Sequence, residues 1–173
     1  MKLFFASTKL RLLLLPALLG TAGLLTTACS KNEEATPTPT PTYTDEEIFQ
    51  SFLTSNKITN AKRQPSGLYY LPRTTDTTAV RATAGKTVSV LYTGALMNGA
   101  VFDASSLHGN TPISFVLGKG QVIAGWDEGI ALMHKGDKGV LLIPSTLGYG
   151  SQAVGSIPAN SPLYFEVELT DVK

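Results

Sequence analysis

The sequence predicts an α+β protein in which an antiparallel sheet of about five strands wraps around one short helix, with an N-terminal accessory helix ahead of the sheet. Two observations predict this fold class. From residue 86 to the C-terminus, short segments alternate between apolar and polar residues, which is the period of half-buried strands. Among them, residues 121–133 carry apolar side chains at three- and four-residue steps, which is the period of a helix. Several strands packed on one helix define an α+β domain.

Four segments of this region have the composition of strands. Alternate positions put apolar side chains on one face in two of them: Val88, Val90 and Tyr92 within 86–94, and Phe165, Val167 and Leu169 within 163–169. Segments 112–118 and 138–144 provide two more strands, the second too uniformly apolar for its faces to be assigned. A further strand begins within residues 66–76, and we expect Pro72 to stop it because proline lacks a backbone donor.

Two helices are expected. The central helix has one apolar face, formed by Val122, Trp126, Ile130 and Met133. Only about ten residues carry this pattern, so the helix has to be short. The accessory helix spans roughly residues 45–55, because Thr44 followed by Glu47 three positions later is the capping-box pattern. Its apolar face consists of Ile48, Phe49, Phe52 and Leu53. That face serves either packing within the chain or formation of a homodimer through residues 44–60.

The N-terminus has the features of a secretion signal. Three basic residues and no acidic one occur in the first 28 positions, and the apolar run LLLLPALLGTAGLL is shorter than the roughly 20 residues of a membrane span. Cys29, the only cysteine, follows small residues in LLTTACSK, so the segment resembles a bacterial lipoprotein signal peptide. The resemblance implies removal of residues 1–28 and lipidation of Cys29. It also implies an extracytoplasmic protein anchored to the lipid bilayer by acyl chains, at the outer membrane on its periplasmic or cell-surface side. The alternative is an incidental thiol at the end of a discarded leader.

Residues 29–43 form a linker that is rich in threonine and proline. The Thr-Pro repeats in ATPTPTPTYT are incompatible with a helix, because proline lacks a donor and restricts the preceding residue. Such a segment is expected to be extended and solvated. At about 3.1 Å per residue it could hold a domain up to about 40 Å from the bilayer.

The residue inventory excludes several classes of chemistry. Beyond residue 28 the chain has 11 basic and 13 acidic residues, so it lacks the basic surface of a nucleic-acid-binding protein. His108 and His134, the only histidines, have no partner at a metal-ligand interval. No serine lies in a nucleophile elbow, and GKGQ is too short for a phosphate loop. We therefore expect no cofactor, no metal and no covalent intermediate.

Five sequence blocks in a fixed order are more specific. VLYTG, GAVFDAS, VIAGWDEGI, LGYG and IPANSPLYFEVEL, with their gaps, closely resemble the FKBP-type peptidyl-prolyl cis–trans isomerases. The resemblance covers roughly residues 80–173, which leaves residues 44–79 as an accessory helix and strand. It implies a five-stranded antiparallel sheet around a short helix with an aromatic pocket between them. It also implies an isomerase that acts on proline-containing segments of secreted or outer-membrane proteins, with macrolides as further ligands.

The family pattern also assigns the pocket. The catalytic residues implied are Tyr92, Phe102, Asp103 and Tyr149. The substrate-binding residues implied are Phe115, Val122, Ile123, Trp126, Ile157 and Phe165. Trp126 would form the floor, while the backbone N–H of Ile123 and the phenol of Tyr149 would donate hydrogen bonds. Ile113 stands where family members often carry an aromatic residue. The alternative interpretation is that these rings only fill a hydrophobic core.

Isomerisation of an Xaa-Pro bond needs no nucleophile. Rotation suspends the amide resonance, at a cost of about 18–20 kcal/mol, but breaks no covalent bond. The twisted amide has lost its zwitterionic character, so a dry apolar cavity penalises it less than the planar form. Rotation can therefore be accelerated by non-covalent groups alone, namely aromatic walls, a few oriented donors and one carboxylate. The same pocket could instead belong to a membrane-tethered chaperone or adhesion module that binds proline-containing segments with little turnover.

Overall fold

The computed structural model describes residues 43–173, so the predicted signal peptide, Cys29 and most of the Thr-Pro linker lie outside the described residues. Two helices and seven strands are present: α1 (Asp45–Ser55), β1 (Lys62–Arg63), β2 (Tyr69–Thr74), β3 (Thr87–Leu96), β4 (Val101–Ala104), β5 (Ile113–Val116), α2 (Ala124–Ile130), β6 (Lys138–Ile143) and β7 (Leu163–Val172). Two short 3₁₀ turns, η1 (Ser105–His108) and η2 (Ser145–Leu147), follow β4 and β6. Neither helix in this part of the chain is long and apolar enough to cross a bilayer.

The strands form one antiparallel sheet, as the sequence predicted. Their order is β1-β2-β6-β7-β3-β4, and β5 also pairs with β3. The predicted alternation is confirmed, because Phe165, Val167 and Leu169 are buried whereas Glu166 is exposed. The sheet has two more strands than expected, since the two-residue β1 and the four-residue β4 are too short to show a period.

Strand β3 is shared by two successive partners along the same edge. Residues 93–95 of β3 pair with β4, and residues 87–90 pair with β5. Between these two ladders the backbone N–H of Tyr92 donates instead to the Ser105 hydroxyl, 3.0 Å away. A side chain therefore replaces a strand partner at the junction between β4 and β5.

The prediction that Pro72 stops its strand is wrong. Strand β2 runs through Pro72, which pairs with Gly139 of β6, and ends at Thr74 after a shift in register. On its other side β2 pairs with β1 only at Tyr69 and Tyr70. The carbonyl of Pro72 accepts a bond from the Asn60 side chain at 3.1 Å. Proline is tolerated here because its missing N–H falls on an open strand edge.

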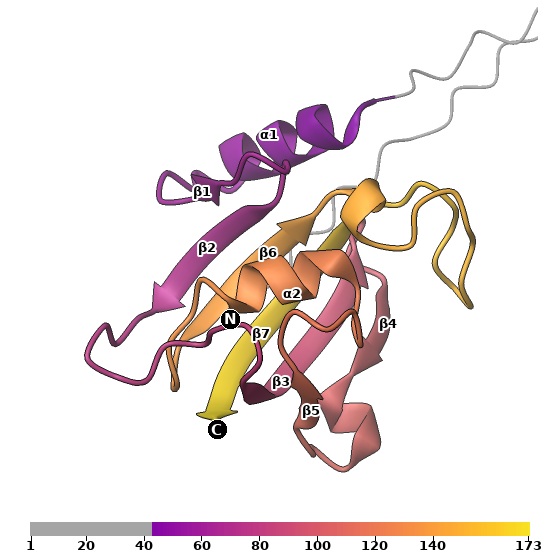
Figure 1. The fold of residues 1–173 in the computed structure, drawn as a ribbon. Coiled ribbons are helices and arrows are strands. Elements are labelled where there is room, and N and C mark those ends of the chain that lie inside the picture. The colour runs from indigo at the N-terminus through magenta and orange to yellow at the C-terminus, as the bar shows by residue number, and fades with distance from the viewer. Residues whose placement is uncertain (1–42) are drawn as a thin grey trace, which may run out of the picture. The chain divides into compact units, whose positions relative to one another are not determined.

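Helix α2 packs on one face of the sheet, across β6 and β7 (Figure 1). Two glycines permit the close approach. A Cβ atom at Gly125 would meet the Ile143 side chain, and a Cβ atom at Gly129 would lie 2.6 Å from Leu141 Cδ1. The helix is shorter than the ten-residue pattern, because Val122 precedes it and Met133 lies in the turn after it. Trp126, Ile130 and Met133 are nevertheless buried together, as predicted.

Helix α1 packs on the opposite face. Phe49 and Leu53 contact Tyr69, Leu71, Val140 and Leu142, whereas the neighbouring residues Tyr70, Leu141 and Ile143 belong to the core under α2. Successive residues of a strand point to opposite faces, so the two helices sandwich the β2–β6 region. The capping box is present, with the Glu47 N–H donating to Thr44 Oγ1 at 3.3 Å. Packing is thus one role of this face, and dimerisation through residues 44–60 stays a prediction.

Candidate active site

A cavity of about 420 Å³ opens between α2, the sheet and the loop that precedes β7. Its lining includes nine of the ten residues predicted for the pocket: Tyr92, Phe102, Asp103, Val122, Ile123, Trp126, Tyr149, Ile157 and Phe165. Five further residues line it: Ile113, Gln121, Val154, Gly155 and Ser156. Its volume falls in the range of about 300–1,000 Å³ typical of small-molecule sites.

Trp126 of α2 forms a fixed centre for the rings. The Tyr92 ring meets it edge-on at 5.2 Å between centroids, and the Phe165 ring does so at 5.3 Å. Trp126 is only 4% exposed. Edge-to-face contacts of this kind are worth about 0.5–1.5 kcal/mol each beyond burial. The rings of Tyr92, Phe165 and Trp126 therefore hold one another in place without a bound substrate.

Gly94 of β3 makes room for the two phenylalanine walls. A Cβ atom at this position would lie 2.6 Å from Phe102 Cε2 and 2.6 Å from Phe165 Cε1. The two rings meet edge-on with centroids 5.5 Å apart. Because real Cβ atoms do not approach carbon so closely, only glycine allows both rings to pack against the strand at this point.

Asp103 and Tyr92 form a hydrogen-bonded pair at the cavity edge. The Tyr92 hydroxyl donates to Asp103 Oδ2 at 2.6 Å. Burial and the adjacent carboxylate raise the pKa of Tyr92 to about 12. The bond from Tyr92, followed by a smaller contribution from His108, holds the pKa of the Asp103 carboxyl below its usual value. The pair is therefore a neutral phenol donating to an ionised carboxylate at neutral pH.

The loop before α2 is braced by two side chains. Asp127 accepts the N–H of Gly118 at 2.8 Å and that of Gly120 at 2.9 Å. Gln121 accepts the N–H of Val116 at 2.7 Å, which ties the loop to the end of β5. These bonds fix the approach to Ile123, the N-cap residue of α2, whose own N–H has no partner among residues 43–173. A donor in a braced loop at the cavity wall is thus available to a ligand.

The opposite rim is a tight hairpin in the loop before β7. Val154 and Ile157 exchange both backbone bonds, each at 2.9 Å. Gly155 has a φ of 56°, so a side chain at this position would be strained. Ile157 is buried whereas Val154 is 43% exposed. The hairpin therefore presents one apolar side chain at the rim and buries the other.

Phe115 is the one predicted pocket residue that does not line the cavity. It is 5% exposed and its ring lies 5.8 Å from that of Trp126. Ile113, two residues earlier on the same face of β5, reaches the cavity in its place. The side-chain braces Asp127 and Gln121 were missed in the sequence, although Asp127 follows directly on Trp126.

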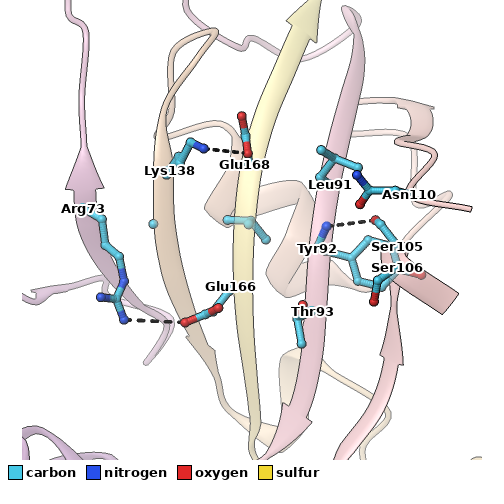
Figure 2. Close-up of a pocket in the computed structure, with 12 residues that line it drawn as sticks. Arg73, Leu91, Tyr92, Thr93, Ser105, Ser106, Asn110, Lys138, Glu166 and Glu168 are labelled. Carbon is cyan, nitrogen blue, oxygen red and sulfur yellow. Dashed lines mark hydrogen bonds and ion pairs between the residues drawn. The ribbon is translucent and has the colours of Figure 1, made fainter. Parts of the chain in front are cut away.

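A second depression, of about 460 Å³, lies on the other side of the sheet (Figure 2). Its surface is polar, with an ion pair between Arg73 and Glu166 at 3.6 Å and one between Lys138 and Glu168 at 2.9 Å (Figure 2). These pairs are exposed, so each contributes about 0–1 kcal/mol to stability. Tyr92 is the one aromatic residue among those that line this depression, whereas the first cavity is walled by several rings with a carboxylate at its edge.

The first cavity thus combines ring walls with a carboxylate at its edge and a backbone donor in its wall that is free among the described residues. Residues 43–173 contain no group of three or more side chains placed to hold a metal ion. The profile of FKBP-type peptidyl-prolyl cis-trans isomerases matches residues 78–170. The chain belongs to the FKBP-type peptidyl-prolyl cis–trans isomerase family, which is an enzyme family.

Individual relatives agree with this assignment. FK506-binding protein 2 of Dictyostelium discoideum is 46% identical over 107 residues, which is 61% of this chain and 77% of that protein. The FK506-binding protein of Neisseria meningitidis serogroup A is 51% identical over 92 residues, which is 53% of this chain and 84% of that protein. The crystal structure of FkpA from Escherichia coli matches with a TM-score of 0.66 and 39% identity, over 75% of this chain and 57% of that chain.

Proposed function

We propose that this protein catalyses cis–trans isomerisation of Xaa-Pro bonds in extracytoplasmic proteins and thereby assists their folding. The aromatic cavity carries the proposal, because it is walled by rings and has a carboxylate and donors only at its edge. Its apolar floor suits a proline ring, which has no hydrogen-bond donor. Since burial of this ring helps the planar and the twisted amide equally, it supports binding and not rate.

The rate enhancement comes from groups that favour the twisted amide. Removal from water disfavours the planar, zwitterionic form, which water solvates better. The Ile123 N–H serves as a donor to the substrate carbonyl and so holds the segment in place. The Tyr149 phenol, on the loop opposite, is the second donor to the substrate. Each factor of ten in rate requires about 1.4 kcal/mol of preferential stabilisation, which a few such contacts supply without a covalent step.

The ionised Asp103 gives the cavity edge its electrostatic character. The hydroxyl of Tyr92 donates to Asp103 Oδ2 at 2.6 Å and so fixes the orientation of the carboxylate. A carboxylate held at the edge of an apolar cavity acts more strongly on a bound amide than one in bulk water, because the local dielectric is lower. We assign Asp103 the role of stabilising the changed charge distribution of the twisted amide, and Phe102 that of excluding water beside it.

Isomerase activity is tested by magnetisation-exchange NMR on a peptide with one Xaa-Pro bond. The protein is residues 30–173, which include the whole of the compact unit 40–173. Wild-type protein should accelerate exchange, and Phe102→Ala and Asp103→Leu should each reduce the acceleration by about tenfold or more. Val80→Ala is the control, since Val80 is 54% exposed and lies outside the cavity. Exchange by wild-type protein at the rate in buffer would rule out the proposal.

The relatives' names also suggest a ligand. Because the curated relatives are named FK506-binding proteins, we propose that this macrolide binds in the same cavity and competes with the peptide. Titration with FK506 should abolish the exchange acceleration of wild-type protein. If the acceleration persisted at saturating FK506, the macrolide and the peptide would not share this cavity.

We further propose that the mature protein is lipid-anchored through Cys29 on the extracytoplasmic side of a bacterial membrane. The support is the basic start, the short apolar run and the cysteine after small residues. Two or more acyl chains would anchor the protein stably, whereas one binds only marginally. Metabolic labelling with palmitate should mark the wild-type chain and not Cys29→Ser. Equal labelling of both proteins would refute the anchor.

A further inference from the structure

The η1 turn, Ser105–His108, holds the Tyr92–Asp103 pair from two sides. Ser105 is 2% exposed, and its hydroxyl accepts the backbone N–H of Tyr92 at 3.0 Å (Figure 2). This bond lies where neither β4 nor β5 pairs with β3. On this edge of β3 the backbone of Tyr92 is therefore held by the turn, while its other edge pairs with Val167 of β7.

His108, at the other end of the turn, holds the carboxylate. Its Nε2 lies 2.8 Å from Asp103 Oδ1, while Asp103 Oδ2 accepts the Tyr92 hydroxyl at 2.6 Å. The N–H of Ala104 also donates to Oδ1, at 2.9 Å. Each carboxylate oxygen is thus fixed by its own partners, and the Asp103 side chain would otherwise be free to turn because it is 40% exposed.

We propose that His108 is a positioning residue for the isomerase reaction: protonated, it fixes the Asp103 carboxylate against Tyr92, and turnover falls as His108 loses its proton. This inference rests on the proposed function. It concerns a residue that acts through Asp103 and does not itself line the cavity.

The chemistry of the imidazole gives the direction of the effect. An imidazolium adds charge attraction to its hydrogen bond with a carboxylate, so it holds the carboxylate more strongly than a neutral ring does. Histidine is the side chain that ordinarily changes charge between about pH 5 and 8. The groups that face this site are Asp103 from β4, Tyr92 from β3, and Tyr149, which acts on Tyr92 from the loop after η2. Asp103 has its pKa lowered and Tyr92 has its pKa raised to about 12, so neither of them titrates in that interval.

The test is a pH profile of kcat/KM by exchange NMR, which requires no coupling protease. For residues 30–173 of the wild type we expect a fall of about two- to threefold from pH 5.5 to pH 8. His108→Arg, whose charge is permanent, should stay at the pH 5.5 level throughout. His108→Gln should be flat at the lower level. His134→Gln is the matched control, because His134 contacts Asp137 in the turn before β6 and does not line the cavity.

Each outcome has a defined consequence. A flat profile for the active wild type, or a His108→Gln variant that keeps the wild-type slope, overturns the positioning role of His108. A wild type without activity at any pH refutes the proposed function instead. If His108→Gln loses structure, its Tm will be lower than that of wild type at every pH. The His108→Arg variant then distinguishes a positioning role from a structural one, because only a positioning role predicts that its rate stays high at all pH values.

Discussion

Gly94→Ala tests the geometry of the cavity walls. The new methyl carbon would lie 2.6 Å from ring carbons of both Phe102 and Phe165. One or both rings must therefore move away from β3 and into or out of the cavity. The backbone of Gly94 has no positive φ, so the effect reports the ring contacts and not backbone strain.

The size of the effect follows from these contacts. Overpacking by one carbon in a well-packed region costs about 1–3 kcal/mol. For a domain of this size that corresponds to a fall in Tm of about 3–10 °C. Because the displaced rings are two of the cavity walls, kcat/KM should fall by about tenfold or more, equivalent to about 1.4 kcal/mol of lost transition-state stabilisation.

Thermal unfolding and exchange NMR measure the two effects of Gly94→Ala. Thr93→Ala is the control, since Thr93 is the neighbouring residue of β3 and lines the second depression, on the other side of the sheet (Figure 2). The control should keep wild-type kcat/KM. If Gly94→Ala kept both the Tm and the kcat/KM of the wild type, the packing of the two rings against this strand would be refuted.

Three further predictions concern other parts of the site. Tyr92→Phe removes the hydrogen bond that contributes most to the lowered pKa of Asp103. That bond stabilises the fold at pH values above 3.8, the usual pKa of the carboxyl, and its contribution is lost as pH falls. In urea titrations the variant should therefore lose less stability than wild type between about pH 5 and pH 2, and an unchanged pH dependence would contradict this prediction. Asp127→Ala frees the loop before α2, so KM should rise about threefold with little change in kcat, and an unaltered KM would show that the loop needs no brace. Gly129→Ala should destabilise the fold by about 1–3 kcal/mol through its contact with Leu141, and unfolding at the wild-type urea midpoint would show that α2 can move away from β6.

Periodicity predicted the elements whose two faces differ in environment. Strand β7 alternates because Phe165 faces α2 while Glu166 faces solvent. Helix α1 was predicted with its correct bounds because its cap, Thr44 with Glu47, is a local interaction. Pro72 was misjudged because its tolerance depends on an open strand edge, which is a property of the assembled sheet.

The candidate site was predicted as far as its residues carry a family pattern. Phe115 and Ile113 lie on the same face of β5, and only the three-dimensional course of the strand decides which one reaches the cavity. The braces from Asp127 and Gln121 join residues through backbone N–H groups, and a backbone donor leaves no trace in the sequence. The junction at Ser105 was invisible for the same reason.

The rate of exchange within the bound peptide tests the central claim most directly. With residues 30–173 of the wild type at saturation, the account predicts that the cis and trans forms of the bound peptide interconvert far faster than the tens to hundreds of seconds seen in solution. Phe102→Ala should slow this interconversion even when the peptide is fully bound. A bound peptide that exchanges at its solution rate would contradict the account and would leave the cavity as a site that only holds proline-containing segments.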